Sequence, residues 1–104
     1  MTSRTLLDAK LAGETVAYPF DFTSRLGVGE TISSASTIAS VYSGTDLSPG
    51  AVVSGAASIS GSVVTQAITG GVLGVTYILA CSAITSAAQT LTQVGILAIT
   101  AGVP

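Results

Sequence analysis

The stretch GGVLGVTYILACSAITSAAQT (Gly70–Thr90) has the pattern of a β-hairpin, and the rest of the chain can be arranged around it. Its glycines predict a turn, and a run of β-forming residues follows from Val75 to Ile84. Side chains of an extended strand alternate between two faces. One face of this run holds Val75, Tyr77, Leu79, Cys81 and Ala83. The other face is also largely apolar, which is typical of a central strand.

Similar short runs, separated by turn residues, fill most of the chain. The other predicted strands are Glu14–Thr23, Glu30–Ser43, Ala51–Val53, Ala56–Ser60, Val63–Thr69 and Ala88–Ile99. About seven short strands at close spacing, with no helix of typical length, indicate an all-β protein. We predict an immunoglobulin-like β-sandwich over residues 14–104, preceded by an N-terminal arm at residues 1–13.

Two strands carry more specific signals. In Glu14–Thr23 the apolar residues alternate, which predicts a core face made of Val16, Tyr18, Phe20 and Phe22. Pro19 lacks a backbone N–H and therefore predicts an edge position or a bulge. In Glu30–Ser43 a change of phase near Ser36 would indicate a bulge.

Three local features complete the prediction. Pro49-Gly50 fits the centre of a type II turn. Tyr77 follows a glycine turn and resembles a tyrosine corner, in which the hydroxyl ties the strand to the preceding connection. In the arm, Leu6, Leu7 and Leu11 are spaced so that one helical turn is possible, and such an arm packs on its own domain or hooks a neighbour.

Charge is scarce and unevenly placed. Only 8% of the residues are charged, against about 25% in an ordinary globular protein, and no residue after Asp46 carries a charge. Exposed sheet edges are usually protected by charges against pairing with other chains. Two interpretations stay open: other subunits cover these uncharged faces, or serine and threonine, more than a quarter of the chain, keep them solvated.

The composition argues against several classes of function. The chain has no histidine and one cysteine, so it cannot form a Ser–His triad, a Cys–His pair or a zinc cluster. Asp21, Glu30 and Asp46 are isolated and favour solvated or turn-capping carboxylates over a cation site. Cys81 is expected to be a buried small hydrophobe. We expect no enzymatic activity, no cofactor and no metal.

Nucleic-acid and membrane partners are not expected either. Three basic residues and a net charge of −2 do not make a nucleic-acid surface. The apolar runs are shorter than the roughly 20 residues of a spanning helix. The N-terminus lacks the apolar region of a secretory signal.

Three stretches together resemble a family of small tailed-phage virion proteins, the fiber–tail adaptor or neck/collar proteins. They are YPFDFTSRLGVGETISSAS (Tyr18–Ser36), VVSGAASISGSVVTQAITGG (Val52–Gly71) and GVTYILACSAITSAAQTLTQ (Gly74–Gln93). The resemblance covers most of the chain after residue 14 and depends on the order and spacing of the motifs. One departure is Ala87-Ala88, where the family tends to have Ala-Gly. The departure bears on the last turn and not on the fold.

The resemblance implies an immunoglobulin-like structural virion protein near the head–tail junction or at the fiber attachment. Its expected partners are connector, tail or fiber subunits, with several copies in a ring-like homo-oligomer. The expected location is the virion, after assembly in the bacterial cytoplasm. Alternatives are a capsid decoration or tail-associated protein, or a non-viral adhesion module. The expected assembly contacts are Leu6, Leu7, Leu11, Asp21 and Phe22.

Overall fold

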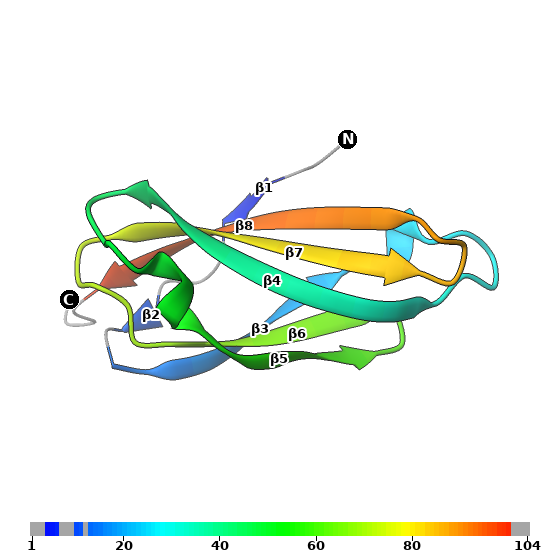
Figure 1. Cartoon of the computed structure of the whole chain (residues 1–104), viewed down its shortest axis with the longest axis horizontal. Coiled ribbons are helices and arrows are strands. Elements are labelled where there is room, and N and C mark those ends of the chain that lie inside the picture. The colour runs from blue at the N-terminus through cyan, green and yellow to red at the C-terminus, as the bar shows by residue number, and fades with distance from the viewer. Residues whose placement is uncertain (1–3, 7–9, 12, 101–104) are drawn as a thin grey trace.

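The computed structural model describes residues 4–6, 10–11 and 13–100, which form two packed β-sheets (Figure 1). The strands are β1 (Arg4–Leu6), β2 (Lys10–Leu11), β3 (Thr15–Asp21), β4 (Ile32–Ser43), β5 (Val53–Ser60), β6 (Val63–Thr69), β7 (Thr76–Thr85) and β8 (Thr90–Thr100). Two short 3-10 helices, η1 (Thr23–Arg25) and η2 (Pro49–Val52), lie in the connections.

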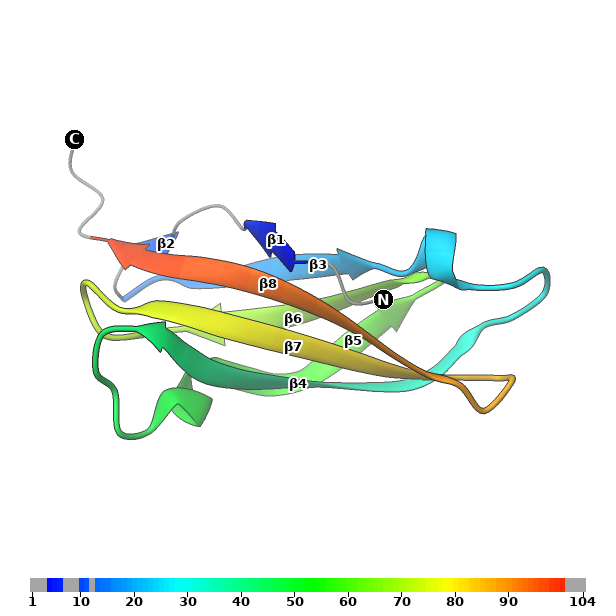
Figure 2. The ribbon, with the colours of Figure 1, turned by 90° about the horizontal axis from the view of Figure 1, so that it is seen from above.

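The larger sheet has the strand order β1-β8-β7-β4, with β2 also paired to β8, and the smaller sheet has the order β3-β6-β5. Among the long strands all pairs are antiparallel, whereas β1 and β2 run parallel to β8. Figure 2 shows the two layers from above, with β8, β7 and β4 in front of β3, β6 and β5. The predicted all-β sandwich is confirmed.

Strand β7 is the central strand that its sequence predicts, because it pairs with β4 on one side and with β8 on the other. The inner face of β7 is completely covered by the smaller sheet. Its buried side chains are Tyr77, Leu79, Cys81 and Ala83. The burial of Cys81 confirms that this cysteine is a core residue, and this burial raises the pKa of its thiol.

Strand β3 and the residue that follows it supply most of the aromatic side chains of the core. Tyr18, Phe20 and Phe22 are buried in the described structure, as their alternation predicts. Pro19 is tolerated because β3 is the edge of the smaller sheet and pairs only with β6. The edge position inferred from this proline is therefore confirmed.

One buried polar residue, Gln66 on β6, completes the smaller sheet. The pairing of β5 with β6 is irregular between Ser54 and Ser58, which leaves carbonyl groups of β5 without ladder partners. The Gln66 amide donates to the carbonyls of Ser54 (3.2 Å) and Gly55 (3.1 Å). The buried Gln66 side chain thus supplies hydrogen bonds to carbonyl groups that the irregular pairing leaves without a partner.

The N-terminal segment differs from the expected helical turn. Residues 4–6 and 10–11 are extended and pair with β8, so hydrogen bonding crosses the predicted boundary at residue 13. Lys10 is buried, and its ammonium donates to the carbonyls of Leu11 (2.7 Å) and Glu14. Burial lowers the pKa of Lys10, and the charge of Glu14 opposes this effect. The backbone hydrogen bonds to β8 and the buried Lys10 therefore favour an extended segment over the helical turn suggested by the spacing of the leucines.

The bulge expected in β4 is present, but it lies between Ile32 and Ser34, where the register with β7 shifts, and not at Ser36 itself. The inward phase changes across it, since Ile32 is buried, whereas farther along the strand Ala39 is buried and Ile38 is exposed.

The predicted type II turn, in contrast, is wrong. Pro49-Gly50 opens the 3-10 helix η2 and is not a type II turn. The predicted strand at residues 51–53 is accordingly replaced by η2, which leads directly into β5.

Ala88, in the turn between β7 and β8, has a φ of +61°, the left-handed region that favours glycine. The left-handed conformation costs an L-residue about 1–2 kcal/mol, whereas glycine loses about 0.4–1 kcal/mol of extra chain entropy on folding. We expect Ala88→Gly to raise the free energy of unfolding by about 0.5–1 kcal/mol. Urea denaturation measures this change.

The neighbouring Ala87 provides the matched control, because it is also exposed and is not among the residues with positive φ. Ala87→Gly is expected to lower the free energy of unfolding, since glycine adds chain entropy there without relieving strain. Equal effects of the two substitutions would show that Ala88 is not strained.

Candidate docking surfaces

The predicted assembly residues do not form one site. Leu6 lies in β1, and Leu7 falls outside the described residues. Leu11 in β2 is exposed. Asp21, at the end of β3, is exposed as well. Phe22 is fully buried in the core, so its side chain offers no surface to a partner in this conformation. Their role in assembly stays a prediction, and the structure leaves Leu11 and Asp21 as its accessible members.

Asp21 caps the turn that follows β3. Its carboxylate accepts hydrogen bonds from the hydroxyl and from the backbone N–H of Thr23 (2.9 Å for the N–H). These bonds hold the pKa of Asp21 below its ordinary value, the hydroxyl having the larger effect. The turn-capping role proposed for this carboxylate is confirmed.

Hydrogen bonds of the Tyr77 hydroxyl stabilise the connections at one end of the sandwich. This hydroxyl donates to the Asp46 carboxylate (2.6 Å) and accepts from the backbone N–H of Val72 (2.9 Å). A second oxygen of Asp46 accepts from the N–H of Ser48 (2.9 Å). Tyr77 therefore ties β7 to the preceding connection, as expected, and also to the connection between β4 and η2.

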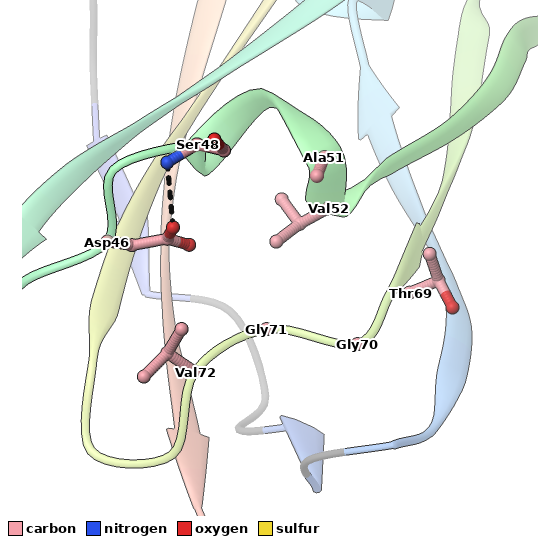
Figure 3. Close-up of a pocket in the computed structure, with 8 residues that line it drawn as sticks. All are labelled: Asp46, Ser48, Ala51, Val52, Thr69, Gly70, Gly71 and Val72. Atoms are coloured by element: carbon pink, nitrogen blue, oxygen red, sulfur yellow. Dashed lines mark hydrogen bonds between the residues drawn. The ribbon is translucent and has the colours of Figure 1, made fainter.

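A pocket of about 360 Å³ opens beside this group of hydrogen bonds (Figure 3). Two chain segments that are distant in sequence enclose it: the loop leading into η2 and the connection from β6 to β7. Its lining residues are Asp46, Ser48, Ala51, Val52, Thr69, Gly70, Gly71 and Val72. Figure 3 shows the Val52 side chain pointing into the space between the two segments. The pocket is therefore mainly apolar, with one carboxylate at its rim.

Gly71, one of the lining residues, lies directly against the core. Its φ is +98°, and a Cβ atom there would lie 2.9 Å from the side chain of Ile99. Any other residue would collide with the core and be strained in its backbone. Leu47 and Leu73, which neighbour lining residues in sequence, are exposed.

Hydrogen bonds of the Glu30 carboxylate stabilise the opposite end of the sandwich. One oxygen of this carboxylate accepts from the N–H of Gly27 (2.8 Å), and the other accepts from the hydroxyl of the buried Thr85. These bonds lower the pKa of Glu30, the Thr85 hydroxyl being the main cause. The loop at Gly27–Gly29 is thereby held to the end of β7, with Val28 at its tip.

The three long strands of the larger sheet, β4, β7 and β8, contain no charged residue. The charged residue Arg4 of the same sheet is paired with Val94 at the opposite edge from β4. Register places Ile38, Ala80 and Val94 side by side across the three strands, and the next row contains Ile78 and Ile96. Ile38 is 69% exposed at the edge strand β4. This outer face, which we call the β4 face, combines an open edge with an apolar row.

The described residues do not bring chemical groups together in a reactive arrangement. Among them, no group of three or more His, Cys, Asp and Glu side chains is placed to hold a metal ion. Instead, the carboxylates of Asp21, Glu30 and Asp46 each accept hydrogen bonds within a different turn. Within the same part of the chain, no helix has the length and apolar character needed to cross a membrane.

Only part of this site could be predicted from the sequence. The position of Tyr77 after a glycine turn pointed to the loop-end contact, but its carboxylate partner 31 residues away had no local signal. The pocket was missed because its two walls come from separate segments of the chain. The exposed Val28 between two glycines was a readable signal, because an apolar residue in a polar turn has no role in its own core.

Removing the Tyr77 hydroxyl should loosen the loop end and change the response to acid. Phenylalanine leaves the Val72 N–H and Asp46 without this partner, so Tyr77→Phe is expected to lower the free energy of unfolding by about 1–2 kcal/mol at pH 7. Urea denaturation measures this change in the free energy of unfolding. Tyr42→Phe is the control, because Tyr42 is exposed.

The pH dependence follows from Asp46, whose pKa is lowered in the folded protein mainly by the Tyr77 hydroxyl. Such a group contributes stability above its ordinary pKa, and this contribution is lost as the pH falls through the lowered value. In Tyr77→Phe the acid loss due to Asp46 should therefore be smaller than in the parent protein. An unchanged acid profile from pH 6 to pH 2 would contradict the contact.

Comparison with known proteins identifies the family. A family model described as "Podophage GP4 fiber-tail adaptor protein gp77" matches residues 10–98. No curated protein and no solved structure matches the chain. The match covers β2 to nearly the end of β8, and with it both ends of the sandwich and the β4 face. The suspected relationship is therefore confirmed, and the chain belongs to the podophage GP4 fiber-tail adaptor protein gp77 family of structural phage tail proteins.

Proposed function

We propose that this protein joins fibers to the tail of a phage particle, in several copies arranged as a ring, and that it acts by binding and not by catalysis. The match over residues 10–98 supports the adaptor role. An adaptor must contact at least two kinds of neighbour, so it needs more than one docking surface. Assembly from subunits made in the host cytoplasm, and a position close to the neck or collar, belong to the same proposal.

The observation that carries the proposal is the uncharged β4 face. An open, uncharged edge strand is a template for pairing with another chain, and soluble monomers usually protect such edges. The other edge of the same sheet is already covered by β1 and β2, so this chain itself uses strand addition at β8. Tail or fiber subunits would cover the remaining edge and the apolar row beside it.

The N-terminal segment is the second surface in the proposal. Leu11 is 37% exposed although its backbone pairs with β8, so its side chain is available to a neighbour. Asp21 lies at the far end of β3 and is also accessible, although its carboxylate is engaged by Thr23. Leu6 and Leu7 complete the predicted contact.

A charge placed on the β4 face should prevent assembly without unfolding the protein. Ile38 is exposed, so Ile38→Glu should change the free energy of unfolding by less than about 0.5 kcal/mol. Burying the unpaired carboxylate against a subunit should reduce incorporation into particles by about tenfold or more. Quantitative mass spectrometry of purified particles measures the copy number.

Ser58→Glu is the matched control, since Ser58 is exposed on β5 of the other sheet. It should enter particles at the normal copy number. If Ile38→Glu also enters normally, the β4 face is not a docking surface.

Leu11→Ser tests the N-terminal segment more cleanly than deletion of residues 1–13, because deletion would also remove the buried Lys10 and uncover β8. The backbone pairing and the lysine remain in this variant. We expect stability within about 0.5–1 kcal/mol of the parent protein and a reduced copy number in particles. Normal incorporation would remove Leu11 from the contact.

A further inference from the structure

The strands β1 and β2, which together we call the N-terminal strap, lie along β8 at the side of the sandwich (Figure 2). They have three and two residues, and in the described part of the chain β8 is the only strand with which either pairs. Their pairing is parallel, which is slightly less stable per residue than antiparallel pairing. Among the described residues, every apolar side chain of the buried core lies at Tyr18 or later in the chain. The core of the sandwich is therefore built without the strap.

One side chain of the strap is nevertheless fully buried. Lys10 is 0% exposed, whereas its neighbour Leu11 is 37% exposed. The Lys10 ammonium donates to the carbonyls of Leu11 and Glu14. The Glu14 carbonyl also accepts from the N–H of Gly70 (3.2 Å), directly after β6. Lys10 thus joins β2 to the edge of the smaller sheet, and its apolar stem is buried in the same place.

We propose that the strap opens away from β8 while the two sheets stay folded, and that the Lys10 side chain is the latch that keeps it closed. A segment with few buried apolar contacts opens at a lower free energy than the core. Opening uncovers the edge of β8 and frees β2, so it changes the surface that the molecule offers to a neighbour. This inference goes beyond the adaptor role and is tested on the protein alone.

Alternation along β8 separates the amide that reports the strap from the amide that reports the sandwich. The Ile99 N–H donates to the carbonyl of Val75 (3.0 Å), directly before β7. Backbone groups of successive strand residues point to opposite sides. The Leu97 N–H therefore faces β7, whereas the Ile96 N–H faces β1, where Ile96 is in register with Leu6.

Native-state hydrogen exchange of the full-length protein measures the opening. We expect the Ile96 amide to be protected at least about 100-fold over an unstructured peptide, and at least about tenfold less than the Leu97 amide. A smaller difference between the two amides overturns the proposal, because the strap would then leave only when the whole protein unfolds. Lack of protection at Ile96 also overturns it, because the strap would then not be closed.

Lys10→Ala tests the latch, because it removes the stem and the ammonium together. We expect the protection of the Ile96 amide to fall about 30-fold or more. Leu11→Ser on the same strand is the matched control, since this side chain is exposed, and it should change the protection by less than about fivefold. A fall in Lys10→Ala no larger than that in Leu11→Ser shows that Lys10 is not the latch.

Two further variants complete the test. Tyr77→Phe should lower the protection of the Leu97 amide and leave that of the Ile96 amide unchanged, because the Tyr77 hydrogen bonds are present whether the strap is closed or open. If Lys10→Ala does not fold, Lys10→Met takes its place. It keeps most of the stem and should still lower the protection of Ile96 by more than Leu11→Ser does.

The two proposals fail separately. If Ile38→Glu blocks incorporation and Ile96 is protected as strongly as Leu97, the β4 face stands and the opening strap is overturned. If Ile96 exchanges through the separate opening and Ile38→Glu enters particles normally, the strap stands and the β4 face is overturned.

Discussion

The hydrogen bonds of the Tyr77 hydroxyl are the interaction on which the loop end of this sandwich depends. Tyr77 is fully buried on the central strand, and its hydroxyl reaches both Asp46 and the backbone of Val72. Burial and the neighbouring carboxylate raise the pKa of this phenol, so it stays protonated and continues to donate. One residue thereby links two connections that cross between the sheets, and residues of both connections line the pocket.

Glu30 plays the corresponding part at the opposite end, with Thr85 and the loop at Gly27 as its partners. In both places a carboxylate accepts hydrogen bonds from one hydroxyl and one backbone N–H. Asp21, Glu30 and Asp46 thus shape turns, and the long strands of the larger sheet carry no charge. The carboxylates therefore fix the conformation of the turns at the ends of the molecule, while the uncharged β4 face stays open to other chains.

Much of this arrangement could be predicted from the sequence because strand alternation is a local signal. The buried face of β7, the aromatic face of β3 and the edge position of Pro19 each follow from residues within a single strand. The pairing of β1 and β2 with β8 could not be predicted, since such short segments show no periodicity and parallel pairing has no turn signal. The position of the bulge in β4 is defined by the pairing of β4 with β7, and the 3-10 helix at Pro49 packs against β4, so both involve residues distant in sequence.

The separation of surfaces matters for an adaptor. A subunit that used one surface for both its own copies and its partners would have to choose between them. Here the β4 strand runs along the side of the sandwich, whereas the loop between η1 and β4 lies at one end of it and the connections from β4 to η2 and from β6 to β7 lie toward the other end (Figures 1 and 2). A neighbour that paired with the β4 edge would therefore leave the connections at the two ends uncovered. If several copies attach side by side, a weak strand-pairing contact becomes a strong attachment through effective concentration.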